Sequence, residues 1–261
     1  MSETSAQATP LQAGDRRLEP VNASMTLSKK DAARREIRRS IITGSLQPGE
    51  RLTEHQLADS LKVSRPTVRE ALNELADEGL VTRSPHRGVK VSALHPATFH
   101  DIALGRIALD MVAVDAILSD ESGERFERVE RCWRQYEIEA FDPDPVVQHD
   151  AHLAFHQGIW EASENYLLTK LWPVTAAQIT IALAEDQRRR SDPEREHRVH
   201  SALMDALRTG DRRVIERRIS LHILTSAERI AKFMAEKGRP STGGAGGIDR
   251  AAAGQLPSTS R

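Results

Sequence analysis

The sequence has almost no cysteine, since Cys132 is the only one among 261 residues. No intrachain disulfide can therefore form, which excludes an extracellular fold held together by disulfides and fits a reducing compartment. No apolar run approaches the roughly 18 residues that a membrane span needs, and residues 1–20 lack the hydrophobic centre of a secretory signal. These absences predict a cytoplasmic protein with no membrane partner.

A large net charge is also lacking, because 37 Lys and Arg balance 38 Asp and Glu. Affinity for a polyanion such as nucleic acid must then come from a local patch of the surface. Residues 29–91 supply one, with 13 basic and nine acidic side chains. Hydrophobic residues make up 39% of the chain, which is enough for a buried core in each of two domains.

Composition and periodicity divide the chain into four parts. Residues 1–27 and 238–261 are rich in Ser, Thr, Gly, Ala and Pro, which predicts disordered tails. Residues 28–94 combine helical segments with a short β-like stretch, whereas residues 95–237 show helical periodicity alone. The expected fold is mainly α, with an N-terminal winged helix-turn-helix and a C-terminal all-α bundle. About six helices are expected in that bundle, at residues 99–118, 123–140, 145–162, 166–188, 193–208 and 212–235.

Residues 53–79 carry the spacing of two short helices joined by a tight turn. Thr53 followed by Gln56 makes a capping box, and Ser64 is a good cap for a second helix that Gly79 ends. Such a pair predicts a helix-turn-helix. The second helix has an apolar stripe, formed by Val68, Leu72 and Leu75.

Burial of that stripe would leave Arg65, Thr67 and Arg69 on the outward face of the second helix. Arginine can donate to guanine O6 and N7 in the major groove of DNA. "LVTRS" and "GVKV" then predict two strands around the turn "PHR", a wing that would bring His86 and Arg87 to phosphates or the minor groove. A charged exposed helix followed by a hairpin is the alternative. The agreement of turn, caps, stripe and wing favours DNA binding.

The first helix expected in this part is strongly basic. Its cations would either contact the DNA backbone or form ion pairs with Asp31 and Glu36 on the same helix. They are Lys29, Lys30, Arg34, Arg35, Arg38 and Arg39.

Four histidines of the helical part have a spacing that suits a metal site. His152 and His156 lie one turn apart on one helix face, and His200 and His222 lie at similar distances on either side of the turn "RTGD". The four imidazoles would converge as metal ligands do in helical bundles, or be ordinary hydrogen-bonded histidines. Imidazole suits zinc, nickel, copper or iron. Two neighbours that would support the site, or replace a ligand, are His149 and His197.

Arg106 lies in the otherwise apolar segment "ALGRIALDMVAVDAI". An arginine inside a bundle requires an anionic partner. That partner is either Asp110, four residues further along the helix, or the carboxylate of a bound effector.

The stretch "IITGSLQPGERLTEHQLADSLKVSRPTVREALNELADEGLVTRSPHRGVKV" resembles the winged helix-turn-helix of the GntR family of bacterial transcription regulators. The likeness is strongest in "VSRPTVREAL" and "RGVKV". The helical part resembles the FCD domain, the ligand-binding domain of the FadR-type subgroup, so that the resemblance covers residues 28–236. It implies a homodimer, held together by the helical domain and bound to a short palindromic operator in double-stranded DNA.

The same resemblance implies roles for individual residues. Arg65 and Arg69 match the base-reading arginines, and His55 stands where the family sometimes uses a third arginine. With the cap and wing added, the expected DNA-binding residues are His55, Ser64, Arg65, Thr67, Arg69, His86 and Arg87.

Further matches lie in the helical part. His156, His200 and His222 match three metal-ligating histidines of FCD domains, and His152 stands where an aspartate is expected. Arg106 matches an arginine that holds the carboxylate of a small organic-acid effector. Asn165 matches a family asparagine for the same effector site, or caps the next helix. The expected cofactor is a divalent metal ion, zinc or nickel.

The expected function is a one-component transcription regulator, a carboxylate sensor that controls its own DNA affinity. One alternative is a metal-dependent enzyme carrying a helix-turn-helix, although "HLAFH" lacks the glutamate of the hydrolase motif HExxH. Another is a regulator whose metal is purely structural.

Overall fold

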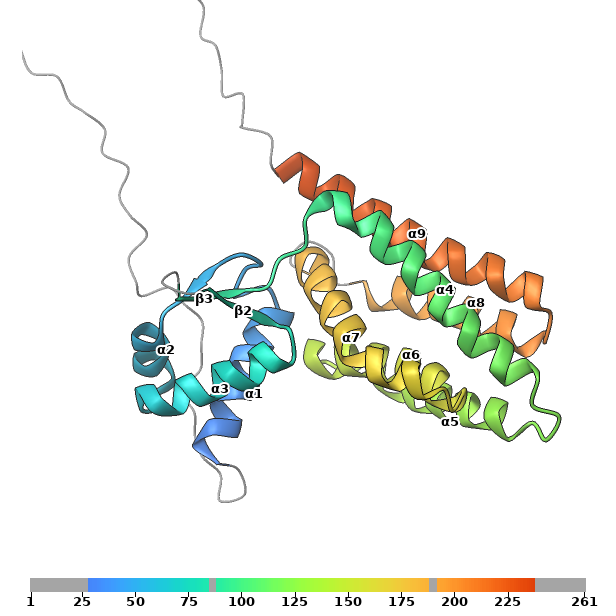
Figure 1. Ribbon diagram of the computed structural model, residues 1–261, viewed down its shortest axis with the longest axis horizontal. Helices are drawn as coiled ribbons and strands as arrows, with labels where there is room; N and C mark the ends of the chain where they lie inside the picture. Colours follow the sequence, from blue (N-terminus) through green and yellow to red (C-terminus); the bar gives the residue numbers. More distant parts are fainter. Residues whose placement is uncertain (1–27, 85–87, 188–191, 238–261) are drawn as a thin grey trace, which may run out of the picture.

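A computed structural model describes residues 28–84, 88–187 and 192–237, and within them the chain forms nine α-helices and three short strands. Figure 1 shows a small N-terminal module beside an elongated helical bundle. The 3-10 turn η1 (Pro96–Thr98) lies between the last strand and the first bundle helix. Both predicted tails lie outside the described residues, as does the wing tip with His86 and Arg87.

The N-terminal module contains α1 (Lys29–Ile42), α2 (Glu54–Leu61) and α3 (Arg65–Asp77). Thr53 caps α2, because its Oγ1 accepts a hydrogen bond from the Gln56 backbone N–H at 3.3 Å. Ser64 caps α3 in the same way, through the Thr67 N–H at 3.3 Å. Between the two helices Lys62 adopts a left-handed conformation with φ of 57°, which closes the tight turn. The predicted helix-turn-helix is confirmed.

The wing is an antiparallel sheet in the order β1-β3-β2, with β1 at Arg51–Leu52, β2 at Val81–Ser84 and β3 at Gly88–Val91. The sequence predicted β2 and β3 but missed β1. Two residues are too few to show an alternating pattern, and only their pairing with β3 makes them a strand. This third strand places Arg51 on the wing.

Within residues 99–187 and 192–237 the bundle contains six helices, as predicted. Two of these helices begin at the expected caps, since Asp144 accepts from the Val146 N–H at 2.9 Å and Asp192 from the Arg195 N–H at 2.9 Å. The core is rich in large aromatic side chains, among them Trp133, which is 2% exposed. The helices are α4 (Phe99–Leu118), α5 (Glu124–Glu139), α6 (Pro145–Ala162), α7 (Tyr166–Gln187), α8 (Pro193–Arg208) and α9 (Arg212–Lys237).

Helix α7 packs against both parts of the molecule. Leu168 and Trp172 belong to the bundle core, whereas Ala177 and Ile181 complete the core of the N-terminal module. At the contact, a Cβ added to Gly79 would lie 3.1 Å from the Ala177 Cβ, so a larger residue would crowd α7. The position of the DNA-binding module therefore depends on α7.

Within the part of the chain that the structure describes, one helix is long and apolar enough to cross a membrane by length and composition. This helix is α7. The window runs over Tyr166–Ala184 and is one third buried. It contains polar residues, which is why the sequence shows no uninterrupted apolar run there. Its buried side chains pack into the two cores just described.

Two ion pairs join α1 to α6 across the two parts. Arg38 Nη2 lies 2.6 Å from Asp150 Oδ1, and Arg39 Nη1 lies 2.7 Å from Asp144 Oδ2. From the sequence, these two arginines were expected either to contact DNA or to pair with Asp31 and Glu36 of their own helix. The observed pairs with Asp150 and Asp144 match neither expectation. Ion pairs also join α1 to α3 and to the residue that follows it: Lys30 pairs with Glu74, and Arg34 pairs with Glu74 and Glu78.

Candidate DNA interface, histidine cluster and effector cavity

The exposed start of α3 presents the predicted base-reading side chains. Arg65 is the first residue of the helix and is exposed, whereas Thr67 is half-buried. Thr67 Oγ1 lies 2.7 Å from Ser64 Oγ, so the cap also holds the Thr67 side chain. The structure thus brings Ser64, Arg65 and Thr67 together at the positive end of a helix dipole, where phosphate is favoured.

Arg69, one turn further along α3, forms a bidentate ion pair with Glu54 of α2. Its Nε donates to Glu54 Oε1 at 2.9 Å and its Nη2 donates to Oε2 at 2.7 Å. The guanidinium lowers the pKa of the Glu54 carboxyl through this hydrogen bond and its charge. Arg69 is still more than half exposed, so the rest of its guanidinium faces outward.

A surface hollow connects the recognition helix to the wing. Its lining includes Arg51 of β1, Arg65 of α3 and Arg83 of β2. Arg83 Nη2 also donates to the Arg69 carbonyl oxygen at 3.3 Å, which ties the wing to α3. Sequence reasoning missed Arg51 and Arg83. The signal for Arg83 was present, because it is a charged residue inside a predicted wing strand.

His55 lines the same hollow from α2. Its Nδ1 lies 3.2 Å from Asp59 Oδ2, and both side chains are largely exposed. His55 and Arg65 therefore line one hollow, from α2 and α3 respectively. His86 and Arg87 lie outside the described residues.

The two histidine pairs of the bundle converge. Ligand nitrogens of His152, His156 and His200 all lie within 4.8 Å of one another. His222 adjoins this group, with its ring centroid 4.9 Å from that of His200 and 5.3 Å from that of His156. Helices α6, α8 and α9 thus bring together all four predicted histidines, with His222 less closely placed than the other three.

The donor set fits a transition metal ion in three respects. His200 Nδ1 lies 2.7 Å from the Glu196 carbonyl oxygen, and donation there leaves the His200 Nε2 lone pair for a ligand. That Nε2 is 3.2 Å from His156 Nε2, close to the roughly 3.3 Å that separates two tetrahedral ligands of a zinc ion with ordinary bond lengths. His222 Nδ1 is buried with no hydrogen-bond partner in the described structure.

Burial also keeps these imidazoles neutral. It lowers the pKa of His200 to about 4, and it lowers the pKa values of His152, His156 and His222 well below their usual value. The charge of Arg106 adds to this effect at all four sites. Neutral imidazole is the form that ligates a metal.

Arg106 is a buried cation whose hydrogen bonds are incomplete. Its side chain is 11% exposed, and its Nε lies 3.7 Å from Asp110 Oδ2, which is an ion pair but not a hydrogen bond. Nε and Nη2 have no hydrogen-bond partner in the described structure. Asp110 instead accepts from Trp160 Nε1 at 2.6 Å. The guanidinium therefore has donors left for an additional anion.

Those donors adjoin a cavity between α4, α7 and α9, with an empty volume of about 690 Å³ that includes its open mouth. Arg106, His152 and His222 all line it. A ligand carboxylate bound by Arg106 would therefore lie beside the histidine cluster. From the sequence, Arg106 and the histidines were assigned to one site only through the resemblance to FCD domains. In the structure, Arg106, His152 and His222 line the same cavity.

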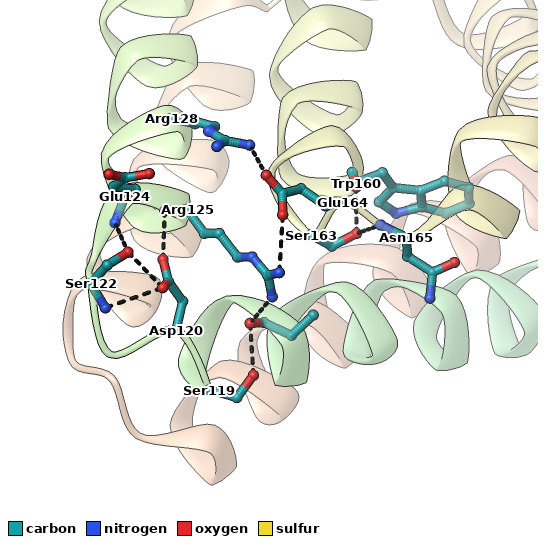
Figure 2. A network of polar contacts seen from close by, with 11 residues as sticks. Ser119, Asp120, Ser122, Glu124, Arg125, Arg128, Trp160, Ser163, Glu164 and Asn165 are labelled. Atoms are coloured by element: carbon teal, nitrogen blue, oxygen red, sulfur yellow. Dashed lines mark hydrogen bonds and ion pairs between the residues drawn. The ribbon is translucent and has the colours of Figure 1, made fainter.

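Asn165 lies elsewhere, at the start of α7. Its Oδ1 accepts from the backbone N–H groups of Leu167 at 2.9 Å and Leu168 at 3.2 Å, which makes it the cap of that helix. Figure 2 shows its surroundings, with Ser163 linked to Asn165 and Glu164 linked to two arginines of α5. Asn165 is not among the lining residues of the cavity, so the geometry favours the cap over effector contact.

The two neighbouring histidines also point away from the cluster. His149 Nε2 lies 3.0 Å from Thr180 Oγ1 of α7, and burial lowers the pKa of His149 to about 4. His197 stacks against Tyr136 with ring centroids 6.2 Å apart and an interplanar angle of 5°. Neither contact involves one of the four clustered rings.

Two family profiles match separate parts of the chain. The profile "Bacterial regulatory proteins, gntR family" matches residues 29–91. The profile "FCD domain" matches residues 101–225. The first covers the winged helix-turn-helix, and the second covers the bundle as far as α9.

Curated relatives carry regulator names. An uncharacterized HTH-type transcriptional regulator in an unstable DNA locus of Streptomyces ambofaciens is 34% identical over 146 residues, 54% of this chain and 58% of that protein. The uncharacterized HTH-type transcriptional regulator YdhC of Bacillus subtilis is 31% identical over 37% of this chain and 43% of its own length. The chain thus spans about half the length of these two. The HTH-type transcriptional repressor RspR of Escherichia coli is 25% identical over 77% of this chain and 89% of its own.

Solved structures show the same fold. E. coli McbR/YncC superposes with a TM-score of 0.54 at 19% identity, over 82% of this chain and 100% of that one. A GntR transcriptional regulator from Rhodococcus sp. RHA1 gives 0.53 at 22% identity, over 79% of this chain and 99% of its own. Domains and relatives together indicate a regulator rather than an enzyme. The chain thus joins a DNA-binding domain of the bacterial gntR family to an FCD domain, and its relatives are named as transcription regulators.

Proposed function

We propose that this protein is a cytoplasmic one-component regulator that binds a palindromic DNA operator as a homodimer and responds to a small carboxylate effector beside a divalent metal ion. The observation that carries the proposal is the cavity in which a buried guanidinium with unused donors meets a histidine cluster. This cavity belongs to the same chain as an exposed, arginine-bearing recognition helix.

On the DNA side, Arg65 and Arg69 would read base edges, and Arg51 and Arg83 would approach phosphates beside them. Operators selected from a random duplex library would be titrated by fluorescence anisotropy at several salt concentrations. Arg69→Ala should weaken operator binding between about fivefold and 150-fold, the range for one bidentate base contact. Arg198→Ala removes an exposed arginine of the bundle and serves as the matched control. Equal operator affinity in both variants would remove Arg69 from the interface.

A dimer is supported by apolar side chains that α4 and its neighbours leave exposed. A two-fold dimer also matches the two half-sites of a palindrome. Val112→Glu, at an exposed position, should shift the protein toward monomer in light scattering without lowering its melting temperature. Among the exposed apolar residues are Leu104, Val112 and Leu118 on α4, Leu167 and Val174 on α7, and Val214 and Leu221 on α9.

On the sensor side, Arg106 would hold the effector carboxylate through its unused donors, and His152, His156, His200 and His222 would hold the metal. When bound, the ion would supply positive charge beside the carboxylate. The four imidazoles suit zinc, nickel, copper or iron, with zinc or nickel proposed here. Elemental analysis of the purified protein should find a bound ion that His156→Ala loses, whereas the exposed variant His100→Ala should keep it.

A purely structural metal is the remaining alternative. A chelator would then lower the melting temperature but leave effector binding intact in the protein that stays folded. The proposal expects the opposite, namely loss of effector binding measured by calorimetry at a temperature where the chelated protein is folded. Arg106→Met should abolish effector binding with the metal still present.

A further inference from the structure

The cavity beside Arg106 has a mainly apolar lining. Ten of its 18 lining residues carry apolar side chains. Arg212 at the start of α9 pairs with Asp115 near the end of α4, so the two helices run antiparallel. One turn before Arg106 on α4 lies Ile102, and further toward the helix start lies Phe99. Together with Ala227 and Ile230 of α9, these two form an apolar arm.

The arm is long enough for an extended hydrocarbon chain. From Arg106 back to Phe99 is seven residues of α4, or roughly 10 Å at the rise of an α-helix. The other charged residues of the lining, Glu196 and Arg229, face each other as an ion pair at 3.9 Å. A second carboxylate on the ligand would compete with Glu196 for Arg229, whereas an apolar chain would leave that pair intact.

The far end of the arm reaches the segment between the two domains. Leu94 lines the cavity, and it also packs against the buried core of the N-terminal module. A ligand that fills the arm would therefore contact a residue that belongs to the packing of the DNA-binding module. A short acid held at Arg106 would not extend that far.

We infer that the effector is an amphiphilic monocarboxylate, with its carboxylate at Arg106 and an apolar chain in the arm between α4, α7 and α9. This inference rests on the proposed sensor function and names its ligand class. Only ligands whose chain reaches Leu94 change the affinity for DNA. Shorter acids bind at Arg106 without that effect.

The test is calorimetric titration of the metal-loaded protein with acetate, butanoate, hexanoate and octanoate, and with octanedioate as a dicarboxylate of the same length. Affinity should rise about fourfold for each added methylene, the ratio that corresponds to burial of one CH₂ group. Octanoate should bind more tightly than octanedioate. Equal binding of acetate and octanoate, or tighter binding of octanedioate, would overturn the apolar arm while leaving Arg106 as an anion site. If none of the acids binds, the sensor function itself fails.

Ala182 of α7 lines the cavity and is half-buried, so Ala182→Leu should fill part of the arm. We expect this variant to lose octanoate affinity by at least tenfold and to keep the affinity of butanoate. The control Ala108→Leu adds the same volume at an exposed position of α4. Unchanged octanoate binding by Ala182→Leu would place the chain elsewhere.

A second inference rests on the recognition helix. Glu54 holds the Nε and Nη2 edge of the Arg69 guanidinium, so Nη1 and the second Nη2 hydrogen form the edge that remains for a base. Glu54 is itself only 22% exposed and is the first residue of α2, where the helix dipole stabilises its charge. The geometry points to Glu54 as a positioning residue that fixes the outward edge of Arg69 for bidentate reading of guanine.

The test uses operators in which each guanine is replaced in turn by 7-deazaguanine, which lacks the N7 acceptor. The wild type should lose affinity at the guanine that Arg69 reads, and Glu54→Gln should reduce that loss by at least about fivefold. Glu70→Gln removes the same charge from an exposed site of α3 and should keep the full loss. Both variants should gain affinity for non-specific duplex DNA. Equal discrimination by the two variants would leave Glu54 with a structural role only and would overturn the inference.

Discussion

Acidification is expected to destabilise the helical domain through His149, which lies buried between α6 and α7. Burial lowers the pKa of this imidazole from its ordinary value of 6.5 to about 4. Between those values the unfolded chain binds a proton that the folded protein does not bind. The free energy of unfolding therefore falls as the pH falls from 6.5 to 4. Each pKa unit corresponds to about 1.4 kcal/mol, so His149 alone accounts for roughly 3 kcal/mol over the window.

The assay is urea denaturation at pH values between 4.5 and 7.5, in the presence of a chelator so that metal binding adds no pH dependence. Tryptophan fluorescence reports the helical domain, because Trp133, Trp160 and Trp172 all lie in its core. His149→Gln keeps a hydrogen-bonding side chain beside Thr180 but cannot titrate. This variant should lose stability less steeply on acidification than the wild type.

His100→Gln is the matched control, since His100 is exposed at the start of α4. Its pH dependence should equal that of the wild type. The comparison uses slopes against pH rather than absolute stabilities, so a constant cost of the substitution does not enter. If His149→Gln and the wild type lose stability with the same slope, burial of His149 does not control the acid response and the reasoning is wrong.

Three further changes should alter stability in measurable ways. Gly158→Ala would place a Cβ in collision with Cys132 Sγ, so chemical denaturation should show a loss of about 1–3 kcal/mol from overpacking between α5 and α6. Asp150→Asn breaks the partly exposed ion pair with Arg38, and we expect a loss of at most about 1 kcal/mol together with faster proteolysis between the two domains. Ser64→Ala removes the cap of α3 and should cost about 1 kcal/mol, seen as a lower melting temperature.

Helix boundaries were largely decided by local sequence. Asp144 and Asp192, like Thr53 and Ser64, accept hydrogen bonds from N–H groups two or three residues ahead, and these contacts need no distant partner. Three predicted bundle helices, at residues 99–118, 145–162 and 193–208, have the bounds that the structure shows. The face on which each histidine lies also follows from helical spacing alone.

Strand β1 and the ion pairs of α1 could not be predicted in this way. Arg51 and Leu52 form a strand only because β3 lies beside them. Arg38 and Arg39 find their acids more than 100 residues away on α6, at a distance that no local pattern encodes. The Glu54 contact that orients Arg69 spans only 15 residues, but it also depends on how α2 packs against α3.

The sequence by itself determined a winged helix-turn-helix, a helical bundle and a set of histidines on the right helix faces, because caps, turns and apolar periodicity act over a few residues. Only the tertiary structure decided which histidines converge. His156 of α6 and His200 of α8 meet because their side chains point toward each other inside the bundle, whereas His149, one turn before His152, turns to Thr180 of α7. The buried guanidinium of Arg106 and its apolar cavity also arise from the packing of α4, α7 and α9, since burial is a property of several chain segments together.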